Sequence, residues 1–250
     1  MGFRGSVALV GAGVPRSHEF EWAVHRFCQS HPDVALVACM GPEIALNRNN
    51  AVRAMQGDWL WCLDDDSIFQ PDALERLLPR LSEVDIVAPM CVRRSLPYDV
   101  LAYVWGADGV AYPITQPPGS GLVMADQVTT MGALIKRSVF DRLEYPWFRV
   151  GQGDMEHNQD DTDFMRRARL AGIRIGCDTD VLMGHITRMV VWPGPDDQIT
   201  VAIGDGRVFQ IPRQWVNATP AVPEMVGLMS AAAMVNGREP IAEPAGVVPS

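Results

Sequence analysis

The chain has 250 residues, of which 48% are hydrophobic and 20% charged, and its formal net charge is −9. These values are typical of one large globular domain with or without an appendage, and the negative charge argues against stable nucleic-acid binding. No apolar run reaches the ~20 residues of a transmembrane helix, no cleaved signal is expected, and five scattered cysteines without a CxxC pair favour buried thiols in the cytoplasm over structural zinc.

The first 90 residues alternate short apolar runs with amphipathic segments. The apolar runs predict strands at residues 7–11, 34–39, 59–63 and 84–89. Helices are predicted after Ser17, which can cap the first one, then over residues 43–56, and from Pro71 to Pro79. This alternation predicts an α/β fold with a Rossmann-like, mostly parallel central sheet and helices on both faces.

Beyond residue 90 the pattern is less regular. We expect short strands or loops over residues 98–118, a strand at 129–135 and a short helix from Arg137. A long polar loop at 145–160 precedes a helix at 161–171, which is followed by two strands at 173–177 and 181–185. A hairpin with a Gly-rich turn is expected at 199–211, and a Pro-, Ala- and Gly-rich tail from residue 217.

These segments predict three parts of the chain. Residues 1–190 form the main domain, with a nucleotide-binding half at 1–90 and an acceptor or sugar half at 91–190. Residues 191–216 form a β-hairpin appendage, and residues 217–250 an extended tail. An apolar patch at 225–235 of this tail gives a possible site of homo-oligomer formation.

Three consecutive carboxylates, Asp64, Asp65 and Asp66, follow the buried strand that begins at Trp59. Like charges so close together repel one another unless a cation is nearby, and hard divalent cations prefer carboxylate oxygens. Because open α/β sheets bind ligands at the carboxyl ends of their strands, the triplet predicts a metal and a phosphorylated ligand there. The other interpretation is that the aspartates cap a turn or the helix that begins near Pro71.

A series of motifs resembles the GT-A glycosyltransferases, and most of all the family 2 type found in bacteria and their phages. The resemblance covers about residues 5–190, and each motif alone is weak. In chain order the matching motifs are Asn47-Arg48-Asn49, Trp59 to Asp66, Met131-Gly132-Ala133, Pro146-Trp147-Phe148, Asp160-Asp161 and Gly184-His185. The resemblance implies a GT-A fold and transfer of a sugar, of the hexosyltransferase type, from a nucleotide-sugar donor.

The resemblance also implies a metal site. By similarity to the DxD element of the family, Asp66 binds Mn²⁺ or Mg²⁺, and Asp64 binds the metal or the ribose, with Asp65 assisting. Gly184-His185 resembles the element that completes the metal shell in this family. An imidazole ligand suits Mn²⁺ better than Mg²⁺, although a lone His at the end of a strand is often structural.

Further residues are implied for the donor and the acceptor. The resemblance implies that Arg48 and Asn49 contact the nucleotide, which is expected to be UDP. It also implies that Gly132 lies on the sugar-binding strand and that Trp147 stacks on a sugar ring. By match, Asp161 is the base that deprotonates the acceptor, a glycan or a protein, and Asp160 replaces the usual Glu. We expect the configuration at the anomeric carbon to be inverted, and a retaining mechanism stays open. The other interpretation of Asp160 and Asp161 is that they cap the helix that begins there.

Two other functional classes remain open on the sequence. Asp64 to Asp66 loosely fits the nucleophile motif of haloacid-dehalogenase phosphohydrolases, but two predicted strands precede it and Lys136 is the only lysine. The chain could also be a non-catalytic module of GT-A type that binds a nucleotide or a glycan. A dinucleotide-binding loop is rejected at Gly11 to Arg16, because the third glycine is missing and Pro15 lies inside the loop.

Overall fold

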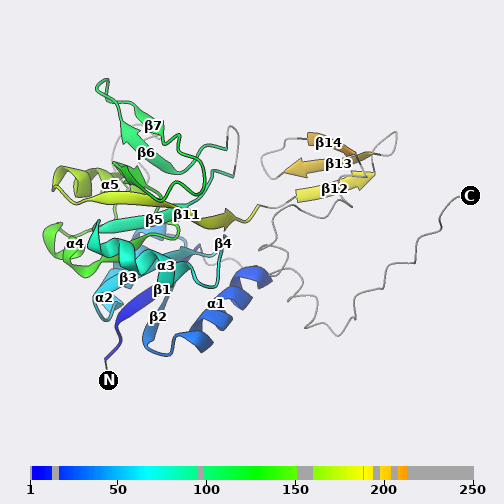
Figure 1. Ribbon diagram of the computed structural model, residues 1–250. Helices are drawn as coiled ribbons and strands as arrows, with labels where there is room; N and C mark the ends of the chain where they lie inside the picture. The colour runs from blue at the N-terminus through cyan, green and yellow to red at the C-terminus, as the bar shows by residue number, and fades with distance from the viewer. Residues whose placement is uncertain are drawn as a thin grey trace, which may run out of the picture. The chain divides into compact units, whose positions relative to one another are not determined.

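A computed structural model gives the structure of the protein and describes residues 2–12, 17–94, 98–150, 160–187, 189–193, 198–203 and 208–212. The chain divides into two compact units, residues 1–187 and residues 188–250. The first unit is built on an eight-stranded sheet of order β2-β1-β3-β10-β5-β11-β4, in which β8 also pairs with β11 (Figure 1). Among the described residues no helix is both long and apolar enough to cross a bilayer.

The parallel part of the sheet comes from the strands that the sequence predicts best. Strand β1 is parallel to β2 and β3, and β5 is parallel to β11. Their bounds are Gly5–Gly11 for β1, Val34–Met40 for β2, Trp59–Asp64 for β3, Ile86–Met90 for β5 and Ile175–His185 for β11. Short antiparallel strands complete the sheet: β4 (Ser67–Phe69), β8 (Leu122–Ala125) and β10 (Leu134–Lys136). The predicted α/β class with a mainly parallel sheet is therefore confirmed.

Helices cover both faces of the sheet (Figure 1). They are α1 (His18–Ser30), α2 (Ile44–Ala54), α3 (Ala73–Leu77), α4 (Arg137–Arg142) and α5 (Asp160–Leu170). Ser17 caps α1 as expected, because its side-chain oxygen accepts a hydrogen bond from the Phe20 amide at 3.1 Å. Helix α2 ends earlier than predicted, at Ala54. Helix α3 ends at Leu77, near Pro79 as predicted, and a 3₁₀ turn, Leu78–Ser82, follows it.

Strand β3 shows how one sequence serves two cores. Its alternate residues point to opposite faces of the sheet. Leu60 and Cys62 pack on the face that α2, α4 and α5 cover, whereas Trp61 and Leu63 pack with residues of α1 and α3. All four side chains are buried. The continuous apolar run of β3 is thus explained by burial on both faces.

Two predictions for the second half of the unit were wrong in detail. The segments 173–177 and 181–185 form one strand, β11, with an irregularity between Asp178 and Leu182. The intervening polar residues remain in the strand because they are paired; the buried Asp178 carboxylate accepts from Arg80 Nε at 2.8 Å. Of the strand expected at 129–135, only residues 134 and 135 lie in a strand, β10, and two other short strands, β8 and β9 (Gln127–Val128), precede this segment.

Two smaller sheets complete the described chain. In the first unit β6 (Ala102–Trp105) pairs with β7 (Ala111–Pro113) and β9, where short strands or loops are predicted. In the second unit β12 (Met189–Pro193), β13 (Gln198–Ile203) and β14 (Val208–Pro212) form an antiparallel sheet. The predicted hairpin is its β13–β14 pair. The turn of this hairpin, the tail from residue 217 and part of the loop 145–160 lie outside the described residues.

Candidate active site

The carboxyl ends of β1, β2 and β3 meet at one edge of the sheet. In the strand register Val10 lies beside Asp64, and Gly11 lies beside Met40. The Asp65 amide then donates to the Val10 carbonyl at 3.1 Å, which holds the acidic triplet against the end of β1. The triplet therefore lies at the sheet edge where open α/β folds bind ligands.

Helix α2 places three consecutive buried polar side chains at this edge. Asn47 donates to the carbonyls of Gly11 and Gly41, at 3.0 and 2.9 Å, and so ties the end of β1 to the segment after β2. Asn49 donates to the Phe148 carbonyl at 2.6 Å and accepts from its amide at 3.2 Å. Asn47 is therefore a buried link between two chain segments, with only 6% of the residue exposed.

Arg48, between these two asparagines, joins two carboxylates from distant parts of the chain. Its Nη1 lies 2.7 Å from both Asp160 oxygens, and its Nη2 lies 3.2 and 3.0 Å from the two Asp64 oxygens. Burial lowers the pKa of the guanidinium, but Asp64, Asp160 and Asp161 outweigh this effect and raise it. Arg48 is therefore a permanent cation between two carboxylates, and its predicted nucleotide contact stays a prediction.

Strand β4, which the sequence does not reveal, brings His185 to Asp66. It follows the acidic turn directly and pairs antiparallel with the end of β11, so that Ser67 lies beside His185. The Ile186 amide also donates to the Asp66 carbonyl at 2.7 Å. As a result His185 Nε2 lies 3.4 Å from Asp66 Oδ2. Arg94 Nη1 lies 2.8 Å from the same oxygen.

The chemistry of this pair fits a divalent cation. His185 Nδ1 lies 3.2 Å from the Val92 carbonyl oxygen. A carbonyl can only accept, so the Nδ1 hydrogen points to it, and Nε2 is the ring nitrogen that faces Asp66. A histidine held in this way by a carbonyl is common among metal ligands. Burial raises the pKa of the Asp66 carboxyl, but His185 and Arg94 outweigh burial and lower it.

The predicted third ligand, Asp64, is engaged elsewhere. Both of its oxygens face Arg48. Within the described part of the chain, no group of three or more His, Cys, Asp or Glu side chains gathers closely enough to hold a metal ion. The structure thus brings together two of the predicted ligands, Asp66 and His185, and holds Asp64 in an ion pair.

The acid pair at the start of α5 has two different environments. Asp160 is buried against Arg48, whereas Asp161 accepts from the Thr162 amide at 2.7 Å. Burial raises the pKa of the Asp161 carboxyl; Arg48 opposes this effect, and the negative charges of Asp160 and Asp64 add to it. A carboxyl with a raised pKa is a better proton acceptor, which is the property expected of a general base.

The remaining predicted residues lie around these groups. A Cβ on Gly11 would lie 2.1 Å from Asp65 Oδ2, so the glycine makes room for that carboxylate. Gly132, with φ of +79°, accepts from the Trp61 indole at 2.9 Å. Trp147 donates its indole hydrogen to the Phe140 carbonyl at 2.8 Å and is partly buried. The donor and sugar contacts of these residues stay predictions.

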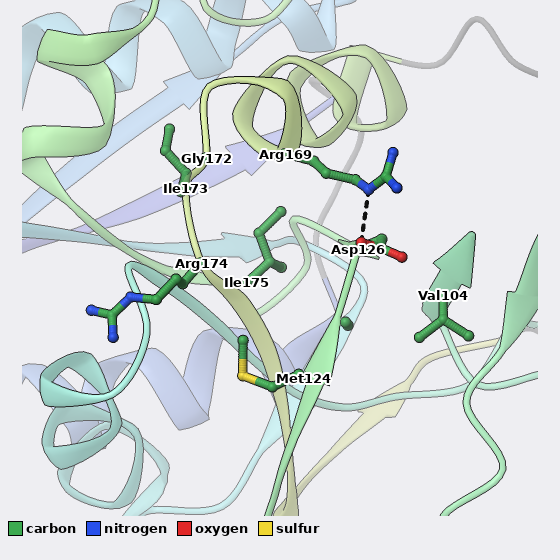
Figure 2. A pocket seen from close by; sticks show the side chains of 9 residues that line it. Val104, Met124, Asp126, Arg169, Gly172, Ile173, Arg174 and Ile175 are labelled. Atoms are coloured by element: carbon green, nitrogen blue, oxygen red, sulfur yellow. Dashed lines mark hydrogen bonds and ion pairs between the residues drawn. The ribbon is translucent and has the colours of Figure 1, made fainter. Parts of the chain in front are cut away.

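A cavity of about 410 Å³ lies at the opposite end of β11 from His185. Figure 2 shows its apolar lining, which includes Met124 and Ile175, and Arg169 near the rim. The Arg169 guanidinium is paired with Asp126 at 2.7 Å. Because the cavity lies at the amino end of β11, it is not part of the acidic site.

The chain is similar to one protein family in sequence and to solved structures in fold. Residues 23–143 match the model of the family described as "Glycosyl transferase family 2". The crystal structure of A197 from STIV is similar, with a TM-score of 0.52 and 13% identity over 82% of this chain and 93% of that one. GalNAc-T7, solved with UDP, GalNAc and Mn²⁺, gives a TM-score of 0.48 and 11% identity over 73% of this chain and 44% of that one. No curated protein sequence is significantly similar to the chain.

These findings confirm the resemblance to GT-A glycosyltransferases of the family 2 type. The family model covers β2, α2, β3, β5 and β10, and with them Arg48 and the acidic triplet. The likeness to A197 covers nearly the whole of that chain and supports the fold. The family match supports a glycosyltransferase that uses a nucleotide-sugar donor. They do not favour the haloacid-dehalogenase alternative, in which the aspartates would end the first strand of the sheet.

Proposed function

From the glycosyl transferase family 2 match and the acidic site at the sheet edge, we propose that this protein is a metal-dependent glycosyltransferase. It transfers a sugar, of the hexosyl type, from a UDP-linked donor to a hydroxyl of a glycan or protein acceptor. The observation that carries the proposal is the convergence at one edge of Asp66 with His185 and of Asp160 with Asp161. Arg48 links the two pairs through Asp64.

The donor side of the proposal rests on the ends of β1 and β3. Asp66 and His185 hold Mn²⁺ or Mg²⁺, and Asp64 either adds a third oxygen or binds the ribose. A bound divalent cation offsets the negative charge that develops on the leaving diphosphate. Asp65, Asn49, Gly132 and Trp147 surround the donor, and Arg94 is available for its phosphates because half of its side chain is exposed.

The acceptor side rests on Asp161. Its carboxylate takes the proton of the acceptor hydroxyl as that oxygen attacks the anomeric carbon of the donor sugar. The bond between the anomeric carbon and the phosphate oxygen breaks, its electron pair leaves with the nucleoside diphosphate, and the anomeric configuration inverts. The raised pKa of the Asp161 carboxyl supports this role, because the carboxylate binds the proton more tightly than an ordinary aspartate does.

The first test measures donor binding through thermal stability. The melting temperature is recorded with UDP, GDP and CDP, each with Mn²⁺, Mg²⁺ or EDTA. A ligand that binds only the folded state raises the midpoint. We expect a metal-dependent shift with UDP in the wild type that is lost in Asp66→Ala and kept in Asp72→Ala, an exposed aspartate that makes no capping hydrogen bond. No shift with any nucleotide and metal would overturn the proposal.

A second measurement separates an enzyme from a non-catalytic binding module. Release of UDP from UDP-sugars is followed in the wild type and in Asp161→Asn. We expect turnover in the wild type and a loss of about 10²–10⁴-fold in the variant, the range of general-base contributions. Nucleotide binding should survive in both proteins. Binding without turnover in the wild type would instead favour the module that binds a nucleotide or a glycan.

A further inference from the structure

The buried ion pairs of Arg48 connect two segments that are far apart in the sequence. Asp64 lies 16 positions after Arg48, whereas Asp160 lies 112 positions after it. The Arg48 side chain is 6% exposed and the Asp160 side chain 12%. In such a dry environment an unpaired carboxylate is costly, so the pairs hold these side chains firmly in place.

The geometry divides the guanidinium between its two partners. Among the residues that the structure describes, Nη1 bonds Asp160, Nη2 bonds Asp64, and Nε is buried without a hydrogen-bond partner. Both terminal nitrogens are thus occupied by carboxylates. A lysine, with a single ammonium group, cannot reproduce this two-sided arrangement.

Asp160 is the first residue of α5 and immediately precedes Asp161. Its carboxylate is turned toward Arg48, and so it fixes the start of the helix that carries the proposed base. The Phe148 ring lies 6.0 Å from the Arg48 guanidinium, and Asn49 holds the Phe148 backbone, which limits movement of α2 relative to this site. Both Asp160 oxygens are thus occupied by Arg48.

We propose that Arg48 is a positioning residue for sugar transfer, which aligns Asp161 through Asp160 and sets it against the donor through Asp64. This inference rests on the proposed function and deepens it. It differs from the direct nucleotide contact that the family resemblance implies, because here Arg48 acts through two carboxylates. Its main effect is on turnover, with a smaller effect on donor affinity.

The test compares turnover and donor affinity in Arg48→Lys, Asp160→Asn and the double variant. Arg53→Lys is the control, because Arg53 is an exposed arginine on the same helix. We expect Arg48→Lys to lower kcat by about 100-fold and to weaken UDP–Mn²⁺ binding by less than about 5-fold, as a misplaced base predicts. Asp160→Asn should lower kcat in the same way, and the double variant should lose about as much kcat as either single variant, because the two residues act as one unit.

Three outcomes separate the hypotheses. If Arg48→Lys weakens donor binding as much as it lowers kcat, Arg48 binds the donor directly and the inference is wrong. If the losses of Arg48→Lys and Asp160→Asn multiply in the double variant, the two residues act independently and the inference is also wrong. A wild type that neither binds nucleotides nor turns over donors overturns the proposed function itself. Melting temperatures of all variants, measured alongside, exclude loss of folded protein as the cause.

Discussion

At the start of α5, the Asp161 carboxyl has a raised pKa because it is buried and faces negative charge. The charged groups that act on it are Arg48 from α2, which lowers the pKa, and Asp160 and Asp64, which raise it. A base must be deprotonated to act, so turnover should fall as the pH drops through this raised pKa. The acid limb of activity therefore lies above the ordinary aspartate value of about 4.

Asp160→Asn provides a check on the sign of this effect. Removing a neighbouring negative charge lowers the pKa of the Asp161 carboxyl, so the acid limb should move to lower pH. The measurement is kcat against pH at saturating donor and acceptor, with nucleotide binding followed over the same range. If the acid limb of the kcat profile stays in place or moves to higher pH, Asp161 is not the base whose titration limits activity.

Gly132 combines a left-handed backbone with close neighbours, and both features predict that any side chain at this position destabilises the fold. At a φ of +79° an alanine is strained, and its Cβ would lie 2.7 Å from the Pro89 ring and 2.6 Å from Met183. We expect Gly132→Ala to lower the free energy of unfolding by about 3 kcal/mol. Gly109 has the same φ but nothing within 4 Å, so Gly109→Ala should cost only about 1 kcal/mol. Chemical denaturation measures the free energy of unfolding of both variants. Equal losses in the two variants would contradict the close contacts of Gly132 as the cause.

At the scale of the elements, Asn49 connects α2 to the segment before the acidic loop. Its side chain bonds both backbone groups of Phe148, a residue that is 1% exposed. Asn49→Ala leaves a buried amide and a buried carbonyl unpaired, and we expect a loss of about 3 kcal/mol. Asn50→Ala, at an exposed position of the same helix, should change stability by less than about 0.5 kcal/mol. Similar losses of stability in the two variants would contradict a stabilising role of the hydrogen bonds between Asn49 and the Phe148 backbone.

The sequence predicts those elements that are determined by residues close together in the chain. The cap at Ser17, the helical spacing of α1 and the apolar run of β3 each depend on neighbouring residues. Strand β4 has three residues and exists through its pairing with β11, more than 100 positions away in the chain, so no local pattern reveals it. The family resemblance brought Asp66 and His185 forward as partners, but the strand that joins them was visible only in three dimensions.

The buried side chains of α2 show the same limit. The sequence gives Arg48 no obvious acidic partner nearby, and its partner Asp160 lies 112 positions away. The weak apolar face of α2 was a usable sign, since a helix whose polar residues lie on its inner side must satisfy them with buried partners. Sequence periodicity alone cannot say which partners these are.

At the scale of the whole first unit, one sheet separates two hydrophobic cores. Leu60 and Leu63 lie on opposite faces of β3, and neither side chain is exposed. Because both cores share this strand, Leu60→Ala and Leu63→Ala should each destabilise the same unfolding transition by about 3 kcal/mol. Leu46→Ala, at a position that is 47% exposed, is the control and should have little effect. Splitting of the transition in either variant would mean that the two faces unfold separately.

Strand β10 has a consequence for the way the protein is made. It lies between β3 and β5 and is antiparallel to both, although it follows β5 by more than 40 positions in the chain. On the ribosome, a nascent chain that has not reached Lys136 holds β3 and β5 without the strand that joins them. Translation therefore exposes two apolar strand edges before the sheet can close, and folding of the donor side must wait for residues that come from the second half of the chain.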